Sequence, residues 1–247
     1  VCSSDLISPN GNIPVHAFNL ISPTFFANSS TGNKYSLWVN VYGVSERYLN
    51  VYGEKDLRAQ MNQFFHRTYT HPVDGTTLDM KMLCNWYWYD ETAILETGKG
   101  TKDWNFYRYA ETLLSAAEAI AQSSGVNAEA AGYLAQVKAR ANMEGKDVST
   151  IASELQRLGK QAFIEECWKE RLREFPLEMK IWDDCVRTGK FPQISATNKG
   201  EVQFVDLIGA KNGSGATFKA TDLYWPIPVN EIQRNPNLTQ NEGYSAK

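Results

Sequence analysis

The chain has 247 residues, of which 43% are hydrophobic and 21% charged, and its net charge is −3 at pH 7. This balance is typical of a globular domain with a sizeable core and argues against a disordered chain. No apolar run reaches the roughly 18 residues that a membrane-spanning helix requires, and no basic stripe offers a surface for nucleic acid. The aromatic content is high, with 7 Trp, 12 Tyr and 11 Phe. Such rings serve either core packing or stacking on the C–H faces of sugars.

The N-terminal residues show no signal peptide, since they contain neither a charged region nor an apolar one. Cys2 is followed by small polar residues, as in the lipid-carrying cysteine of a mature bacterial lipoprotein, but no lipobox precedes it. A truncated chain end is therefore the favoured interpretation. The thiols lack metal-site spacing relative to one another or to histidine. We therefore expect the thiols to be mostly buried and inert, and we expect no metal or cofactor. Besides Cys2, the cysteines are Cys84, Cys167 and Cys185.

Residues 1–100 are rich in Pro, Gly, Asn, Ser and Thr, and their apolar periodicity is poor. This composition predicts loops, short strands and at most short helices. One short helix is predicted after the capping residue Ser45, running to Tyr52 and stopping at Gly53. A second is predicted over residues 55–66.

Two longer helices are predicted at 104–121 and 128–141, where apolar residues recur at i, i+3, i+4 and i+7. Ser123-Ser124-Gly125 ends the first of them. The loop between the two is short, which predicts an antiparallel hairpin of the TPR type. In the first helix the apolar positions are Tyr107, Ala110, Leu113, Leu114, Ala117, Ile120 and Ala121.

A third helical run is predicted from Ser149 to about Arg187, broken or kinked at Gly159 and interrupted at Pro176. Loops are expected again beyond residue 190, with turns at 212–215 and 235–237. The segment 224–228 should be extended, because each proline disfavours a helical conformation in the residue before it. No linker separates these regions, so we expect residues 1–247 to belong to one domain.

Pairs of carboxylates are the feature that would favour glycoside hydrolysis, which needs two such groups about 5–10 Å apart across a cleft. The helical pairs alternate with Lys and Arg at i,i+3 and i,i+4 spacing, as in Glu165–Lys169, Glu170–Arg173 and Asp184–Arg187. This spacing is typical of a salt-bridged helix surface, so we predict that the protein is not an enzyme. The pairs considered are Glu165/Glu166, Glu170/Glu174, Asp183/Asp184 and Asp90/Glu91.

An aromatic surface is the better candidate for a ligand site. If the run from Asn85 to Tyr89 is extended, Trp86 and Trp88 lie on one of its faces. Aromatic faces next to amides suit the C–H surfaces and hydroxyls of sugars, while core packing is the alternative for each ring. The predicted ligand-binding residues are Trp38, Asn40, Tyr42, Asn85, Trp86 and Trp88.

Several separated motifs resemble those of the SusD/RagB family, in the family's order and spacing, over about residues 54–247. Four positions depart from the family pattern: Leu57 replaces Pro, Met179 replaces Gly, Ile181 replaces Arg and Cys185 replaces Leu. The matching motifs are Asp56-Leu57-Arg58, the helix starting Arg108-Tyr109-Ala110-Glu111, Val137-Lys138-Ala139-Arg140-Ala141, Glu170 to Phe175 with Glu178, Trp182, Asp184 and Arg187 to Lys190, Tyr224-Trp225-Pro226-Ile227-Pro228, and Asn235 to Asn241 with Tyr244.

The resemblance implies a mainly α fold of TPR-like helical hairpins with long irregular loops and short strands. Residues 1–247 would be its C-terminal part, with the N-terminal TPR half and the lipoprotein signal missing. It also implies a lipid-anchored protein on the extracellular face of the outer membrane of a Bacteroidetes-type bacterium. Such a protein binds an oligosaccharide and delivers it to a SusC-like TonB-dependent transporter. The alternatives are a RagB-like peptide-binding uptake protein and a helical protein–protein adaptor.

Overall fold

The structure is a computed structural model that describes residues 44–72, 75–87, 89, 91, 105–176 and 178–245, with the backbone alone at residues 78, 80–82 and 85. The described chain is mainly helical and forms two compact units. Of the described residues, those up to 178 and those from 194 to 201 form the first unit, and residues 179–193 and 202–245 form the second. The expectation that residues 1–247 belong to one domain, as its C-terminal part, stays a prediction.

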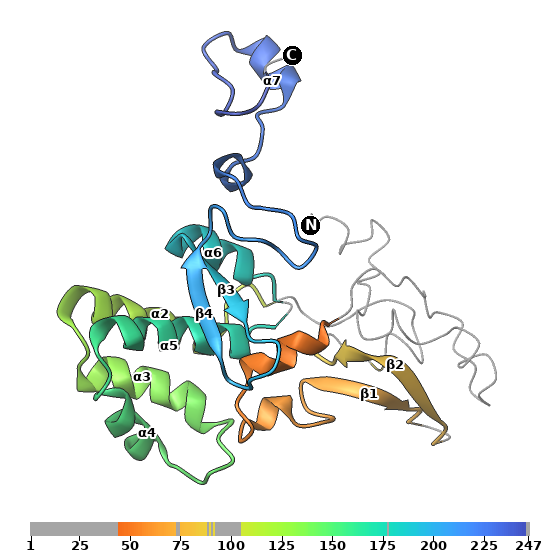
Figure 1. Ribbon diagram of the computed structural model, residues 1–247, viewed down its shortest axis with the longest axis vertical. Helices are drawn as coiled ribbons and strands as arrows, with labels where there is room; N and C mark the ends of the chain where they lie inside the picture. The colour runs from red at the N-terminus through yellow and green to blue at the C-terminus, as the bar shows by residue number, and fades with distance from the viewer. Residues whose placement is uncertain are drawn as a thin grey trace. The chain divides into compact units, whose positions relative to one another are not determined.

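The helical hairpin of the first unit consists of α2 (Tyr109–Ser124) and α3 (Ala128–Ala139), which lie side by side (Figure 1). Gly125 ends α2 with a φ of +82°, a conformation that glycine adopts without steric cost. The Asn127 side chain caps α3 by accepting a hydrogen bond from the backbone N–H of Ala130 (2.9 Å). Both predicted helices are confirmed, although the first begins at Tyr109.

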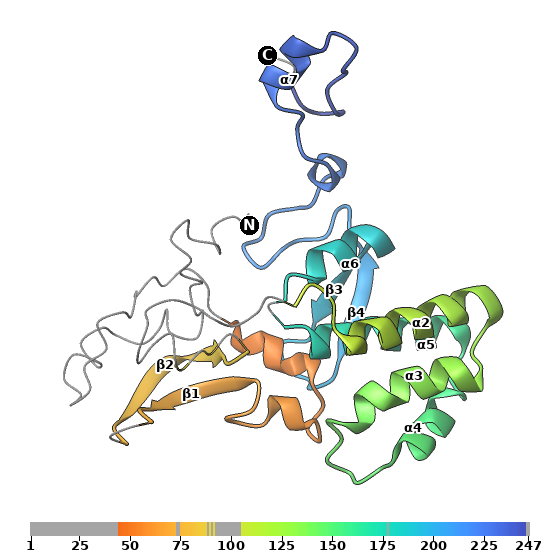
Figure 2. The same cartoon turned by 180° about the vertical axis from the view of Figure 1, so that it is seen from behind.

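Two further helices complete this unit, α4 (Val148–Leu155) and α5 (Lys160–Glu174). The Asp147 carboxylate caps α4 through the N–H of Thr150 (2.8 Å). The predicted break at Gly159 is confirmed, since Gly159 is the N-cap of α5. Figure 2 shows α5 alongside α2, and α4 against α3.

The core of the first unit lies between α2, α3, α4 and α5. Small residues dominate the α2–α3 contact, so the two backbones approach closely, and larger side chains fill the space against α4 and α5. Among the described residues, no helix is long and apolar enough to cross a bilayer. The buried core residues include Leu113, Leu114, Ala117, Ala121, Ala130, Ala131, Leu134, Ala135, Ile151, Leu155, Phe163 and Cys167.

Upstream of the helices, η3 (Glu46–Val51) is a 3₁₀ helix at the position predicted for a short helix after Ser45. The helix predicted over 55–66 is wrong. Only η4 (Leu57–Ala59) forms a short 3₁₀ turn there, because the backbone N–H of Leu57 donates to the carbonyl of Ala141 (2.8 Å), at the end of α3. The chain then enters β1 (Phe65–Thr70), which pairs antiparallel with β2 (Thr77–Asn85).

The second unit begins with α6 (Ile181–Thr188), which Gly189 ends in the left-handed conformation (φ 66°). The strands β3 (Lys190–Ile194) and β4 (Val202–Asp206) pair with each other, and the chain beyond them is rich in loops, as expected. Two short helices follow, η6 (Ala220–Leu223) and α7 (Val229–Arg234). The predicted turns at 212–215 and 235–237 and the extended segment at 224–228 are confirmed.

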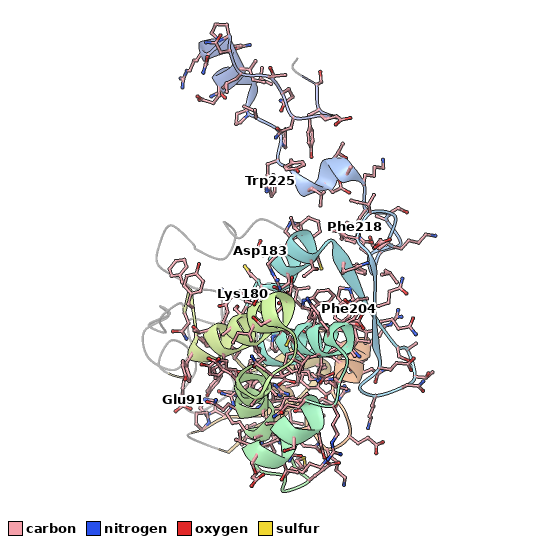
Figure 3. The ribbon with its side chains drawn as sticks, turned by 90° about the vertical axis from the view of Figure 1, so that its left-hand side faces the viewer. Glu91, Lys180, Asp183, Phe204, Phe218 and Trp225 are labelled. Carbon is pink, nitrogen blue, oxygen red and sulfur yellow. The ribbon has the colours of Figure 1, made fainter. Side chains whose placement is uncertain are left out.

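Phe218, labelled in Figure 3, packs against two other aromatic rings of the second unit. Its ring centre lies 5.6 Å from that of Trp182 and 5.2 Å from that of Phe191. This contact joins α6 and β3 to the segment before η6.

Candidate ligand-binding site

The charged residues of the motifs meet in a buried ionic cluster at the C-terminal end of α5. Arg58 is its pivot: its guanidinium contacts Asp56 (2.7 Å), Glu170 (2.8 Å) and Glu174 (3.0 Å). Asp56 also accepts a hydrogen bond from the backbone N–H of Arg58 (3.0 Å), which fixes η4. The short motif around Leu57 is thereby attached to α5.

Two further cations, Arg173 of α5 and Lys138 of α3, complete one side of this cluster. Arg173 donates to Glu166 (2.9 Å), to Glu170 (3.2 Å) and to the backbone carbonyl of Val51 (3.0 Å). Lys138 of α3 pairs with Glu166 and lies 3.7 Å from Glu170. The predicted i,i+3 pair between Glu170 and Arg173 is therefore confirmed.

The other side of the cluster is formed by Arg108 and Arg140. Arg108 donates to Glu174 (3.0 Å) and, through two nitrogens, to Glu178 (2.9 and 2.7 Å). Its guanidinium also lies 4.9 Å from the ring centre of Phe175, within range of a cation–π contact. Arg140 at the end of α3 pairs with Glu174. The start of α2 and the end of α3 are thus attached to α5 by charge.

The cations of the cluster lower the pKa of two of its carboxylates, Glu170 and Glu166. Burial alone would raise the pKa of Glu170, but the charges of Arg58, Lys138 and Arg173 outweigh it and lower the pKa from 4.5 to about 2. At Glu166, burial also raises the pKa, but the charges of Lys138 and Arg173 outweigh it, so the pKa of Glu166 is lowered as well. Ionised, hydrogen-bonded carboxylates stabilise the fold and are poor proton donors at neutral pH.

In each of the other carboxylate pairs, at least one residue has a partner. Asp184 pairs with Arg187 (3.0 Å), as predicted. Glu165, which was expected to pair with Lys169, accepts a hydrogen bond from Gln161 (2.9 Å) instead. Glu91 accepts one from Tyr89 (2.9 Å), while Asp90 lies outside the described residues.

A cavity of about 450 Å³ lies over the cluster, between the 53–58 segment and the end of α3. Buried Arg58, Glu170 and Arg173 line it, and charged side chains of both signs line it further out. Such a lining suits a polar ligand that carries hydrogen-bonding groups or both charges. The outer charged residues are Glu54, Lys55, Glu144, Lys146 and Glu154.

Trp86, one of the predicted ligand residues, is half-buried between two other rings beside the β1–β2 hairpin. Its ring is parallel to that of His66 (centres 3.9 Å apart, 10°) and to that of Tyr89 (4.8 Å, 14°). Two parallel rings so close to one indole cannot share a face without overlapping, so they cover opposite faces. Burial lowers the pKa of His66, so the imidazole on Trp86 is neutral at pH 7.

The extended conformation assumed for residues 85–89 is therefore wrong. β2 ends at Asn85, and the N–H of Tyr89 donates to the carbonyl of Trp86 (3.1 Å), which turns the chain and stacks the two rings. Asn85 pairs through its backbone with Phe65. The other four predicted residues lie outside the described residues, and their role stays a prediction: Trp38, Asn40, Tyr42 and Trp88.

Among the described residues of the first unit, the most exposed aromatic side chains lie at the start of α2, and the sequence did not indicate them as ligand residues. Phe106, Tyr107 and Tyr109 are 74, 81 and 72% exposed; we call these three the aromatic ridge. Assigning Tyr107 to the buried face of a helix was wrong, because α2 starts only at Tyr109. Three aromatic residues within four positions were the available signal.

Comparison with known proteins identifies the family. The model of the SusD family matches residues 28–244. The chain belongs to this family. A curated SusD-family relative, the "Starch-binding protein SusD" of Bacteroides thetaiotaomicron, is 36% identical over 138 residues, which cover 56% of this chain and 21% of that protein. A SusD superfamily protein of Parabacteroides distasonis has a solved structure that is 29% identical, with a TM-score of 0.73, over 97% of this chain and 49% of that one.

The chain therefore spans about half the length of the solved SusD relative. The likeness confirms the predicted mainly α, TPR-like SusD fold, and the family match confirms the predicted membership. In this chain, the motif residues Arg58, Arg108 and Glu170 meet in the ionic cluster. Their charges are paired with one another inside the protein, so these residues hold parts of the fold together.

Proposed function

We propose that this protein binds an oligosaccharide without altering it and passes it to a SusC-like TonB-dependent transporter. The observation that carries the proposal is the SusD family match over residues 28–244, together with the relative that is named a starch-binding protein. The site of action is the extracellular face of the outer membrane, with the full-length protein attached by a lipid.

The state of the carboxylates supports binding without catalysis. A glycosidase needs a carboxylic acid with a raised pKa as proton donor. Glu170 has a pKa of about 2 and Glu166 a lowered one, because both face several cations. These groups hold no proton to donate at neutral pH.

A peptide is the second candidate ligand, and the cavity over the ionic cluster is the observation that favours it. Its lining carries both charge signs, so it could pair with the termini and side chains of a short peptide. A sugar has no charges to pair with this lining and would gain from aromatic faces instead.

Titration calorimetry of the purified chain against a panel of neutral oligosaccharides and mixed-charge peptides tests the proposal. Saturable binding of a glycan, with no binding of the peptides, is the expected result. The same mixtures should release no reducing sugar. Saturable binding of peptides alone would replace the sugar with a peptide, and sugar release abolished by Glu170→Gln or Glu166→Gln would contradict a non-catalytic role.

A further inference from the structure

We propose that the cavity over the ionic cluster is a binding site for a small oxyanion, that is, a phosphate or a carboxylate group. The proposal does not depend on oligosaccharide binding, because the described residues that line the cavity include no aromatic side chain on which a sugar could stack. Its volume of about 450 Å³ is within the range of small-molecule sites. All of the lining residues belong to the first unit, so the site lies within one compact body.

Two cations in the inner part of the cavity are adjacent and keep unused N–H groups. Arg173 and Lys138 contact the same two carboxylate oxygens, Oε1 of Glu166 and Oε2 of Glu170. The Arg173 side chain is only 9% exposed. Its Nε and Nη1 are bonded, while Nη2 has no hydrogen-bond partner among the described residues and is not enclosed by protein. Lys138 uses one of its three donors in a hydrogen bond to Glu166. Both cations therefore have donors to offer a ligand.

Lys55 is a third cation of the lining, and its charge is unpaired. Its side chain is exposed, and among the described residues no carboxylate lies within ion-pair distance of it. Its backbone is fixed, because its carbonyl accepts a hydrogen bond from the N–H of Met143 (3.0 Å), beyond the end of α3. The ammonium group of Lys55 is thus open to a ligand while its backbone is anchored beside the cavity.

The carboxylates of the lining are paired, which argues against a cationic ligand. Each of them lies within 4 Å of a cation of the protein, which a cationic ligand would have to displace. Among the described residues, no group of three or more His, Cys, Asp or Glu could hold a metal ion. The charge left to be matched is therefore positive, and its complement is an anion. The pairs are Glu54–Lys199 (3.9 Å), Asp56–Arg58 (2.7 Å), Glu144–Lys146 (3.0 Å), Glu154–Lys146 (2.9 Å) and Glu170–Arg58 (2.8 Å).

An oxyanion suits these donors because its oxygens accept several charge-assisted hydrogen bonds at once. Arg173 and Lys138 are held by Glu166 and Glu170 before a ligand arrives, so they lose little conformational entropy on binding. The cavity is lined by three separate parts of the chain, the 53–58 segment, the end of α3 and α5. A bound oxyanion would add bonds between them, and the folded chain should therefore become more stable as the ligand concentration rises.

The experiment titrates inorganic phosphate into the whole chain at low ionic strength, followed by calorimetry and by amide NMR. We expect saturable binding that weakens as NaCl is added, with the largest amide shifts at Gly53, Lys55 and Asn142. Lys55→Met should raise the Kd about fivefold and leave the melting temperature of the free protein unchanged. Lys55→Arg keeps the charge and should stay close to the parent. Lys211→Met is the matched control, because Lys211 is also exposed but lies in the second unit.

Three further probes distinguish the sources of the oxyanion. Acetate presents a free carboxylate, glucuronate presents one on a sugar ring, and glucose is its neutral counterpart. A Kd for glucuronate at least tenfold below those of phosphate and acetate assigns the site to a sugar acid, and similar values for all three anions assign it to the free ion. Arg173→Lys keeps the charge but removes the Nη2 donor, so it should weaken phosphate binding as well; if this variant does not fold, the Lys55 variants decide.

Several results would overturn the site. Heats that do not saturate, with amide shifts scattered over the exposed lysines, mean that phosphate only screens the surface charge. The same follows if Lys55→Met and Lys211→Met lose affinity equally. An unchanged Kd in Lys55→Met, or glucose that binds as tightly as glucuronate, also contradicts an oxyanion in this cavity. A parent protein that binds none of the three anions removes the site and leaves the proposed binding of oligosaccharide untouched.

Discussion

Arg58 and Glu170 form a buried ion pair, with 2.8 Å between Nη1 and Oε1, although 112 positions separate them in the chain. Their side chains are only 5 and 1% exposed. A charge at this depth is tolerated only when it is paired and hydrogen-bonded. The pair therefore attaches the distant 56–58 segment to α5 and contributes to stability only while both are in place.

Arg58→Met is expected to lower the free energy of unfolding by about 3–5 kcal/mol, because it leaves Glu170 as a buried charge that has lost its closest partner. Urea unfolding followed by circular dichroism measures this loss. The matched control is Arg234→Met, which breaks the exposed Arg234–Glu231 pair (3.1 Å) and should cost less than about 1 kcal/mol. Equal effects in the two variants would show that the buried pair contributes no more than a surface pair.

Stability should also depend on acid pH through Glu170. Its pKa is about 2 in the folded protein against an ordinary value of 4.5. A lowered folded pKa contributes stability that is fully present above about pH 4.5 and is lost as the pH falls toward 2. The expected contribution is about 3 kcal/mol, since each unit of pKa is worth about 1.4 kcal/mol.

Urea unfolding at a series of pH values tests this. Glu170→Gln, although less stable throughout, should lose less stability on acidification than the parent, whereas Glu231→Gln at the exposed pair should follow the parent curve. If the free energy of unfolding falls equally steeply at acid pH in Glu170→Gln and in the parent, other groups cause the acid sensitivity.

Local sequence signals predicted the helices and their ends well. Gly125, Gly159 and Gly189 each mark a helix boundary as expected, and Pro176 follows the end of α5. The strand β1 was missed because only two of its residues, Phe65 and Tyr69, point inward, and because its first two residues fall in the segment predicted as a helix over 55–66. Period-two alternation is weak evidence in so short a strand.

The ionic cluster and the ridge could not be predicted in the same way. The i,i+3 partner of Glu170 was visible in the sequence, but its partner Arg58 is separated by 112 positions and becomes a neighbour only through tertiary packing. The ridge depends on where α2 begins, and the apolar spacing of Tyr107 continues the helical pattern without revealing that the helix starts later. Helix starts are the least certain part of a prediction from periodicity.

Met179 offers a stability test at a position where the family has Gly. Its φ is 61°, in the left-handed region that is unfavourable for residues with a Cβ atom. Met179→Gly should therefore raise the free energy of unfolding by about 0.5–1 kcal/mol, after the entropy that glycine loses on folding is subtracted. Met179→Ala keeps the Cβ and should show no gain. A lower stability for the glycine variant than for the alanine variant would contradict backbone strain at this position.

The buried thiols should be unreactive in the folded protein. Cys84, Cys167 and Cys185 are buried and form no disulfide, and burial raises the pKa of Cys84 and of Cys185 to about 12. Titration with a thiol reagent in a Cys2→Ser background should detect no thiol under native conditions at mildly alkaline pH. It should detect all three in guanidinium chloride. Rapid reaction of one thiol in the folded protein would show that its surroundings open to solvent.

Trp86→Ala separates a structural role from a ligand role at the one predicted ring whose surroundings the structure describes. The indole lies between His66 and Tyr89, so its removal empties a stack and should lower the free energy of unfolding by about 1–3 kcal/mol. Tyr107→Ala on the exposed ridge should change it by less than about 0.5 kcal/mol. Urea unfolding of both variants, with glycan calorimetry in parallel, gives the comparison. If Trp86→Ala abolishes glycan binding while its stability equals that of the parent, Trp86 contacts the sugar directly and the stack must open to admit it.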